Sequence, residues 1–184
     1  MPRTEPKVTL REHLDTIDQN SIAGVNNFKS LSRRLKSHFV NAGYEKSSKL
    51  PHLIETYIHM IFETQGYRCT HWLEVNDGEL NGVWNRPGYN YNSWKRQEVM
   101  YEIDHVVPYN AGGKDRLDNF QFLSANANQF TKCSLLYDDL LKRVDLSDRL
   151  KNRIKEVLTK RQELFESKKW KDFIDTLEKV EGRK

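Results

Sequence analysis

The sequence predicts an α+β fold in which a small strand–loop–strand–helix unit is flanked by mainly helical N- and C-terminal extensions. Residues 101–108 and 120–123 are short β-branched or aromatic runs, and the stretch 110–113 between them is strong turn chemistry. Ser124 is a good N-cap for a helix that we expect to run to about Leu136. Apolar residues at helical spacing on both sides of this unit predict the flanking helices.

Length and composition divide the chain into three parts. Of the 184 residues, 37% are hydrophobic and 30% are charged, which suits a modest core with charged helices attached. We expect a basic helical extension (1–50), a central domain (51–136, with its core at 99–136) and a charged helical extension (137–184). No run of about 18 apolar residues occurs, and the first residues lack an apolar signal core. We therefore expect a cytoplasmic protein with no membrane partner.

The distribution of charge points to a polyanionic partner. The net charge is +4, with a pI near 9.0. Residues 1–52 carry +4 and residues 137–184 carry +3, whereas residues 53–136 carry −3. Basic arms around a less basic centre suit a protein whose arms hold a polyanion. A pair of ordinary solvated helices is an equally good interpretation.

Several helices are predicted outside the central unit. The first covers 10–17, and a second covers 28–39 and ends at Gly43. The second carries basic residues opposite its apolar face, including Arg33 and Arg34, which we expect to meet phosphates. A third, at 51–64, begins with Pro51 and is the best candidate for burial, and residues 67–75 read as extended. Behind the unit, we expect helices at 137–150, 150–165 and 170–177, with Asp145 or Ser147 as a cap.

The segment 76–98 combines Asn and Gly with interleaved Trp, Tyr and basic residues. One interpretation is a substrate-contacting loop or hairpin, in which aromatic rings stack on bases and Arg86, Lys95 and Arg96 reach the nucleic acid. The other is a hairpin that its aromatic side chains pack against the core. Lys114, in the loop between the two strands, is a further candidate for contact with phosphate.

Four polar residues fall at regular places in the central unit. Asp104 and His105 end the first strand, Asn119 lies 14 residues after His105, and Asn128 lies 9 residues after Asn119. Together with Pro108, the glycine pair at 112–113 and the leucine at 123, this pattern resembles the ββα-metal core of the HNH endonucleases. The two spacings are those of the HNH domain in RNA-guided nucleases. The resemblance covers about 32 residues, from 101 to 132.

The resemblance implies a role for each of these residues. Phosphodiester hydrolysis needs a base for the attacking water and positive charge near the reacting phosphate. The family pattern implies that His105 is the base, that Asp104 and Asn128 hold one Mg²⁺ or Mn²⁺, and that Asn119 fixes the loop and orients His105. Asn126 is an alternative or supporting ligand, and Lys132 lies one turn after Asn128 on the same helix face. Taken singly, these residues read as a surface pair, a turn residue and a helix cap.

The segment around Cys69 is similar to the one that precedes many HNH cores, where a Cys-x-x-Cys knuckle binds structural zinc. Trp72 stands at the place of the second cysteine, and Ser124 and Ala127 stand at the places of the partner knuckle. His71 is the one extra ligand nearby, which is too few for a closed zinc site. We therefore expect no structural zinc, with Trp72 and Ala127 packed in its place.

The resemblance predicts a metal-dependent HNH endonuclease that hydrolyses DNA and leaves 5′-phosphate and 3′-hydroxyl ends. Small free-standing HNH proteins of this kind are phage, homing or restriction-type nucleases, which nick as monomers or cut both strands as homodimers. The alternative is a non-catalytic nucleic-acid-binding module that uses the HNH fold as a scaffold. The retained Asp104, His105 and Asn128 favour the enzyme. A secreted bacteriocin-type nuclease is less consistent with the sequence, since there is no His-His pair at 104–105 and no toxin-like translocation region.

Overall fold

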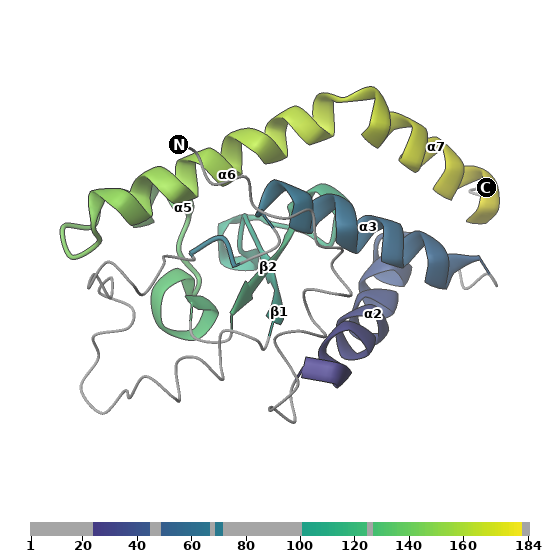
Figure 1. Cartoon of the computed structure of the whole chain (residues 1–184), viewed down its shortest axis with the longest axis horizontal. Coiled ribbons are helices and arrows are strands. Elements are labelled where there is room, and N and C mark those ends of the chain that lie inside the picture. Colours follow the sequence, from purple (N-terminus) through teal and green to yellow (C-terminus); the bar gives the residue numbers. More distant parts are fainter. Residues whose placement is uncertain (1–23, 45–48, 67–68, 72–100, 125–126, 182–184) are drawn as a thin grey trace, which may run out of the picture.

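The computed structural model describes residues 24–44, 49–66, 69–71, 101–124 and 127–181. Within these residues a two-stranded antiparallel sheet lies at the centre, and α3 packs between the sheet and the long α6–α7 layer (Figure 1). The predicted α+β class is confirmed at this level, as helices mixed with one small sheet. The elements in chain order are α2 (Gly24–Asn41), α3 (Leu50–Thr64), β1 (Tyr101–His105), η2 (Tyr109–Ala111), η3 (Leu117–Asn119), β2 (Phe120–Ser124), η4 (Ala127–Lys132), α5 (Tyr137–Leu140), α6 (Asp148–Glu166) and α7 (Lys168–Glu181).

The two strands lie where the β-branched and aromatic runs predicted them. In their antiparallel register, Tyr101 faces Ser124 and His105 faces Phe120. The first strand is shorter than predicted and ends at His105. The Val106 amide still donates to the Asn119 carbonyl oxygen at 2.8 Å, in the register of the ladder, but the Asn119 amide turns away and donates to the Arg116 carbonyl oxygen at 2.9 Å. The loop therefore starts directly after the histidine.

The helices before the sheet follow their apolar periodicity. α2 begins at Gly24, earlier than predicted, and buries Leu31, Leu35 and Phe39. It ends with a left-handed Gly43 (φ +95°), and the next amide donates to the Phe39 carbonyl oxygen at 3.0 Å. Because L-residues avoid that backbone region, a glycine is the natural stop. α3 has the predicted proline in its first turn and presents a wide buried face.

The main core joins residues from all three of the parts that the sequence suggested. Phe62 of α3 packs against Phe122 and Tyr101 of the sheet, with ring centroids 4.7 and 4.8 Å apart. Gln65, just after α3, donates to the Phe122 carbonyl oxygen at 2.7 Å and accepts from the Phe122 amide at 3.0 Å. Side chains of α2 and α7 belong to the same buried cluster. The flanking helices thus help to hold the sheet in place.

The structure corrects the helix predictions that follow the sheet. The predicted helix 124–136 is a π-helix over Ala127–Lys132, in which the Cys133 amide bonds to the Asn128 carbonyl oxygen five residues back at 2.8 Å. Cys133 has a positive φ of 44°, which ends the helix there. The predicted helix 137–150 is also wrong, since α5 covers only Tyr137–Leu140 and turns follow it. α6 then starts after Ser147, whose hydroxyl caps the Leu150 amide at 3.2 Å.

Residues 69–71, the only described part of the stretch predicted as extended, form a turn. The predictions for residues 1–23, for Trp72 and for the segment 76–98 lie outside the described residues. In the described ranges, no helix is both long and apolar enough to cross a membrane.

Candidate active site

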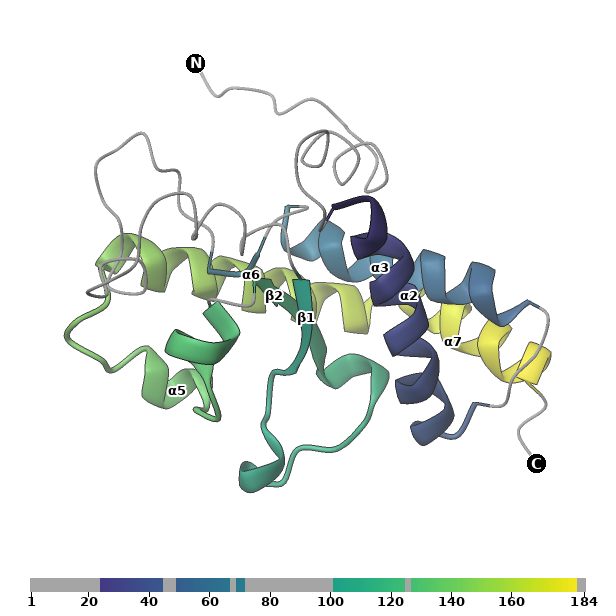
Figure 2. The same cartoon turned by 90° about the horizontal axis from the view of Figure 1, so that it is seen from below.

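The loop between the strands projects beyond the end of the sheet (Figure 2). Asn119 closes it, since its side chain accepts from the Val107 amide at 2.9 Å and donates to the carbonyl oxygens of Val107 and Lys114 at 3.0 and 3.1 Å. Gly113 is needed at the crossing, because a Cβ there would lie 1.7 Å from the Val107 carbonyl oxygen. The loop therefore returns beside the end of β1, where His105 is placed.

His105 meets a carboxylate from the same loop. Its Nε2 lies 2.7 Å from Oδ1 of Asp115, and the two side chains are 14% and 13% exposed. When Nε2 carries the proton, it donates to Asp115 and leaves a lone pair on Nδ1. No described residue bonds to Nδ1. The arrangement is a His–Asp dyad with one imidazole nitrogen held and the other available to accept a proton.

Asp115 is held as an anion by several donors. Besides His105, the Tyr109 hydroxyl donates to Oδ1 at 2.6 Å and the Asn41 amide donates to Oδ2 at 3.0 Å. Burial acts to raise the pKa of Asp115, but the hydrogen bonds from Tyr109, His105 and Asn41 outweigh it and lower the pKa to about 2. Asp115 is therefore ionised at neutral pH and can orient and stabilise the imidazole.

Asp104 points to the opposite face of the sheet from His105, because successive strand residues alternate. Its Oδ2 accepts from Gln121, directly across the ladder, at 2.8 Å. Gln121 in turn accepts from Tyr137 and Thr70 at 3.0 and 3.2 Å. Asp104 is only 8% exposed, and burial raises its pKa, opposed mainly by the positive charge of Lys132. The predicted metal ligand is thus part of a buried polar network.

Lys132 links the two faces of the strand end. Its side chain is fully buried, with Nζ 3.9 Å from Oδ2 of Asp104 and 3.4 Å from the His105 carbonyl oxygen. The π-helix brings it there, since Lys132 is the last residue of η4. Lys132 therefore supplies the positive charge nearest to Asp104 among the described residues.

Asn128 lies at the same face as Asp104. Its amide donates to Oε2 of Glu102 at 2.7 Å, and Glu102 is two residues before Asp104 on β1. Among the described residues, no group of three or more His, Cys, Asp or Glu side chains is arranged to hold a metal ion. A site here would combine the two carboxylates with the Asn128 amide oxygen, a donor set that fits Mg²⁺ or Mn²⁺. Such an ion would compete with Lys132 for Asp104.

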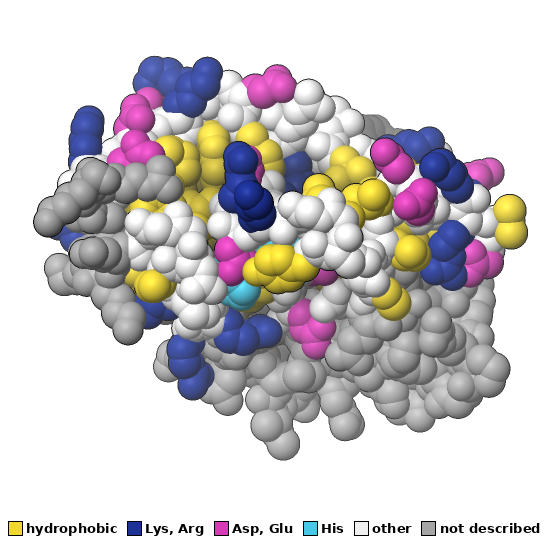
Figure 3. Space-filling model, turned by 180° about the vertical axis from the view of Figure 1, so that it is seen from behind, with side chains coloured by type: hydrophobic (Ala, Val, Ile, Leu, Met, Phe, Trp, Pro, Cys, Tyr) yellow, Lys and Arg dark blue, Asp and Glu magenta, His cyan; other side chains and the backbone are white. Residues whose placement is uncertain are grey.

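The residues predicted to contact nucleic acid differ in how the structure places them. Arg33 and Lys114 are exposed, and no described residue pairs with either side chain. Arg34 instead donates to the Tyr101 carbonyl oxygen at 2.6 Å, which ties α2 to β1. Arg86, Lys95, Arg96 and Asn126 lie outside the described residues. On the face shown in Figure 3, a small area of exposed histidine adjoins acidic and hydrophobic side chains, with Lys and Arg groups nearby.

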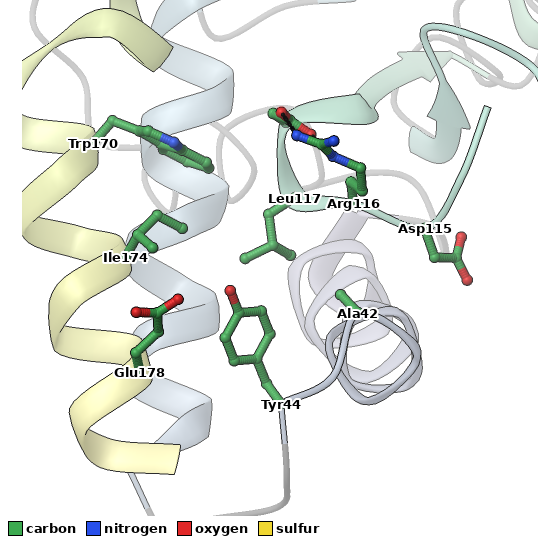
Figure 4. A pocket seen from close by; sticks show the side chains of 9 residues that line it. Ala42, Tyr44, Asp115, Arg116, Leu117, Trp170, Ile174 and Glu178 are labelled. Atoms are coloured by element: carbon green, nitrogen blue, oxygen red, sulfur yellow. Dashed lines mark hydrogen bonds and ion pairs between the residues drawn. The ribbon is translucent and has the colours of Figure 1, made fainter. Parts of the chain in front are cut away.

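A pocket of about 420 Å³ is lined by the loop residues 115–118 and by α7. Trp170 and Ile174 of α7 form one wall, and Leu117 and Tyr44 form the other (Figure 4). Asp115 contributes to the rim, but its carboxylate points away from the α7 side chains (Figure 4). The pocket and the His–Asp dyad therefore share the loop 115–118 but face different ways.

His71, the extra candidate for zinc, is buried in the polar network. Its Nε2 lies 3.0 Å from the Tyr137 hydroxyl, and its Nδ1 has no hydrogen-bond partner among the described residues. Burial, reinforced by the charges of Lys132 and Arg153, lowers the pKa of His71 to about 3. His71 is consequently neutral at physiological pH. Ala127 is fully buried.

Sequence analysis missed residues that surround the predicted site. Asp115 and Tyr109 lie in the same loop as His105, and the turn residues together with Asn119 could have indicated that the loop folds back. Gln121 faces Asp104 in the register, which strand alternation could have suggested once the pairing was known. Asn41 and His38 come from α2, and no local pattern connects them with the loop.

Asp115→Asn tests whether the dyad depends on the carboxylate charge. The amide of asparagine keeps an oxygen that can accept from His105 Nε2 but lacks the negative charge that stabilises a protonated imidazole. The folded pKa of Asp115 is lowered, so its contribution to stability is present above its ordinary pKa near 3.8 and is lost as the pH falls toward 2. The difference in melting temperature between wild type and variant should therefore shrink from pH 4 to pH 2. A constant difference would contradict the ionised state of Asp115.

Comparison of the chain with protein-family models, with curated proteins and with solved structures gave no match.

Proposed function

We propose that this protein is an endonuclease that hydrolyses DNA phosphodiester bonds with His105 as the general base, by the chemistry of the HNH enzymes that its central unit resembles. The observation that carries the proposal is the 2.7 Å contact between His105 Nε2 and Asp115, at the end of a two-stranded sheet whose loop Asn119 closes. A positioned imidazole of this kind is suited to take a proton from water at neutral pH.

Each step of the proposed reaction uses a group of this chain. Asp115 holds His105 by Nε2, so that Nδ1 takes a proton from the attacking water. The water oxygen bonds to phosphorus as the P–O3′ bond breaks, and the leaving 3′-oxygen takes up a proton, which gives 5′-phosphate and 3′-hydroxyl ends. Asn119 keeps the strand end in place because it closes the loop. Lys132 does so through its contact with the His105 carbonyl oxygen.

The proposal includes one Mg²⁺ or Mn²⁺ at the face formed by Glu102, Asp104 and Asn128. The support is the chemistry of these oxygen donors and their place on the same face of the sheet. When bound, the ion would supply positive charge to a phosphate oxygen at that face of the strand end.

The second candidate is a nucleic-acid-binding module without catalysis. The observation in its favour is that Asp104 is already engaged by Gln121 and faced by buried Lys132, so the network is satisfied without a metal. The His–Asp dyad is not needed by a scaffold, which is why we prefer the enzyme.

The test is cleavage of supercoiled plasmid in Mg²⁺, in Mn²⁺ and in EDTA. The proposal predicts relaxed or linear product with either metal and no product in EDTA. Open-circle product would indicate a single-strand nick, whereas linear product would indicate paired active sites and a homodimer. An inert protein that still binds DNA under all three conditions would support the scaffold instead.

Arg33→Ala and Arg34→Ala form a matched pair for the DNA interface. We expect Arg33→Ala to weaken DNA binding for all sequences and to lower the slope of log K against log[salt] by about 1, because it removes one phosphate contact. Arg34→Ala should mainly lower the melting temperature, because Arg34 anchors α2 to the Tyr101 carbonyl oxygen. Fluorescence anisotropy at several salt concentrations measures the slope, and an unchanged slope for Arg33→Ala would remove Arg33 from the interface.

A further inference from the structure

Asp115 is shared by a second histidine, which comes from outside the strand–loop–strand unit. His38 lies in the last turn of α2, and its Nδ1 is 3.5 Å from the same Oδ1 that contacts His105. The two imidazole rings are 6.1 Å apart between centroids, and both pack on the ring of Phe120, at 4.8 and 5.1 Å. The carboxylate therefore lies within reach of two imidazoles that share one apolar support.

The nitrogens of His38 have distinct environments. Nδ1 is buried and has no hydrogen-bond partner among the described residues, so Asp115 is its nearest ionic partner. No described residue bonds to Nε2, and the side chain is 26% exposed. A proton on each nitrogen would satisfy Nδ1 against Asp115 and leave an N–H at Nε2 directed to other partners.

We propose that His38 is the general acid of the proposed reaction and donates the Nε2 proton to the leaving 3′-oxygen. The inference rests on the proposed function, because it needs His105 as the base for the same phosphate. Water gives its proton to His105 as its oxygen bonds to phosphorus, the P–O3′ bond breaks, and the 3′-oxygen takes the proton from His38. His105 then carries one proton more and His38 one fewer, so exchange with solvent restores both. The net charge of the site does not change over the cycle.

The separation of the two rings suits this division of roles. In an in-line displacement the attacking water and the leaving 3′-oxygen lie on opposite sides of phosphorus, and each gives or accepts a hydrogen bond over about 2.8 Å. Two imidazoles whose centroids are 6.1 Å apart leave room for one ring to contact the water and the other to contact the 3′-oxygen. Each ring approaches Asp115 with one nitrogen, so the second nitrogen of each ring can bond to the substrate or the attacking water.

The experiment compares two leaving groups in wild type and in His38→Ala. The substrates are two DNA duplexes that differ at one linkage, at which the leaving atom is either a 3′-oxygen or a 3′-bridging sulfur. The wild type is first shown to cut at this linkage. Sulfur leaves as a stable thiolate and needs no proton. His38→Ala should cut the oxygen linkage about 10²–10⁴-fold more slowly than the wild type, and the sulfur linkage within about threefold of the wild-type rate.

Two controls separate a chemical role from a structural one. His38→Gln keeps a side chain that can bond to Asp115 but cannot give up a proton, so it should show the same selective loss with a melting temperature near that of the wild type. His52→Ala, at an exposed position on α3, should leave both rates unchanged. If His38→Ala slows cleavage of both linkages equally, or of neither, His38 is not the general acid. Cleavage by the wild type would still support the proposed nuclease function. A wild type that cuts neither would overturn the proposed function as well.

Discussion

His105→Ala should slow DNA cleavage by about 10²–10⁴-fold, the range expected when a positioned general base is removed. The reason is geometric, because His105 is the one described histidine held by a hydrogen bond to an ionised carboxylate at the strand end. DNA affinity should stay within about twofold of the wild type, since a neutral base contributes little to phosphate binding. Plasmid nicking under saturating protein, beside an anisotropy titration, measures the two effects separately.

The comparison needs a variant that keeps the local packing. His105 contacts the rings of Phe120 and Tyr109, at 5.1 and 4.4 Å between centroids, so truncation removes packing as well as the base. His105→Gln fills more of this space and should lose as much activity as His105→Ala. If either variant cuts DNA at the wild-type rate, His105 is not the base. His52→Ala serves here as the matched exposed control.

Lys132→Met should destabilise the folded protein by about 3 kcal/mol, which corresponds to a fall in melting temperature of roughly 6–12 °C for a chain of this size. Methionine retains most of the side-chain volume but removes the ammonium group that faces Asp104 and the His105 carbonyl oxygen. The buried carboxylate then keeps its hydrogen bonds from the Gln121 amide and the His105 backbone but loses the ammonium charge. Lys114→Met, at an exposed position in the loop, should change the melting temperature very little.

The pH dependence of this effect follows from Asp104. Its pKa is raised in the folded protein, so the stability linked to its protonated form is present below its ordinary pKa and is lost as the pH rises through the folded value. Removing the Lys132 charge should raise that pKa further. The deficit of Lys132→Met relative to wild type should therefore be smaller at pH 5 than at pH 8. The Lys132 charge also lowers the pKa of buried His71, so its removal can only lessen the deficit of the variant toward low pH. A deficit below about 1 kcal/mol at pH 8, or one that grows toward pH 5, would contradict the Lys132–Asp104 interaction.

Local sequence patterns were sufficient where the physics is local. The β-branched and aromatic runs place both strands, and apolar periodicity places α2, α3, α6 and α7 to within a few residues. The same patterns failed after the sheet, because the π-helix depends on an i to i+5 bond and on the positive φ of Cys133, which no spacing rule indicates. Residues 137–150 have the composition of a helix, but the chain turns after Leu140 so that Leu140 and Leu146 can join the same buried cluster as α6.

By itself, the sequence determined the loop and the order of polar residues around it. Gly113 permits the close crossing, Asn119 provides the hydrogen bonds that close the loop, and His105 ends its strand, all from chemistry within 15 residues. Only the tertiary structure decided which partners these residues meet. Asp115, His38 and Asn41 converge because α2 packs against β1, and Lys132 is buried because the helix after the sheet turns it inward. Backbone conformation responds to neighbours in sequence, whereas side-chain charge and proton partners depend on which distant elements share a packed surface.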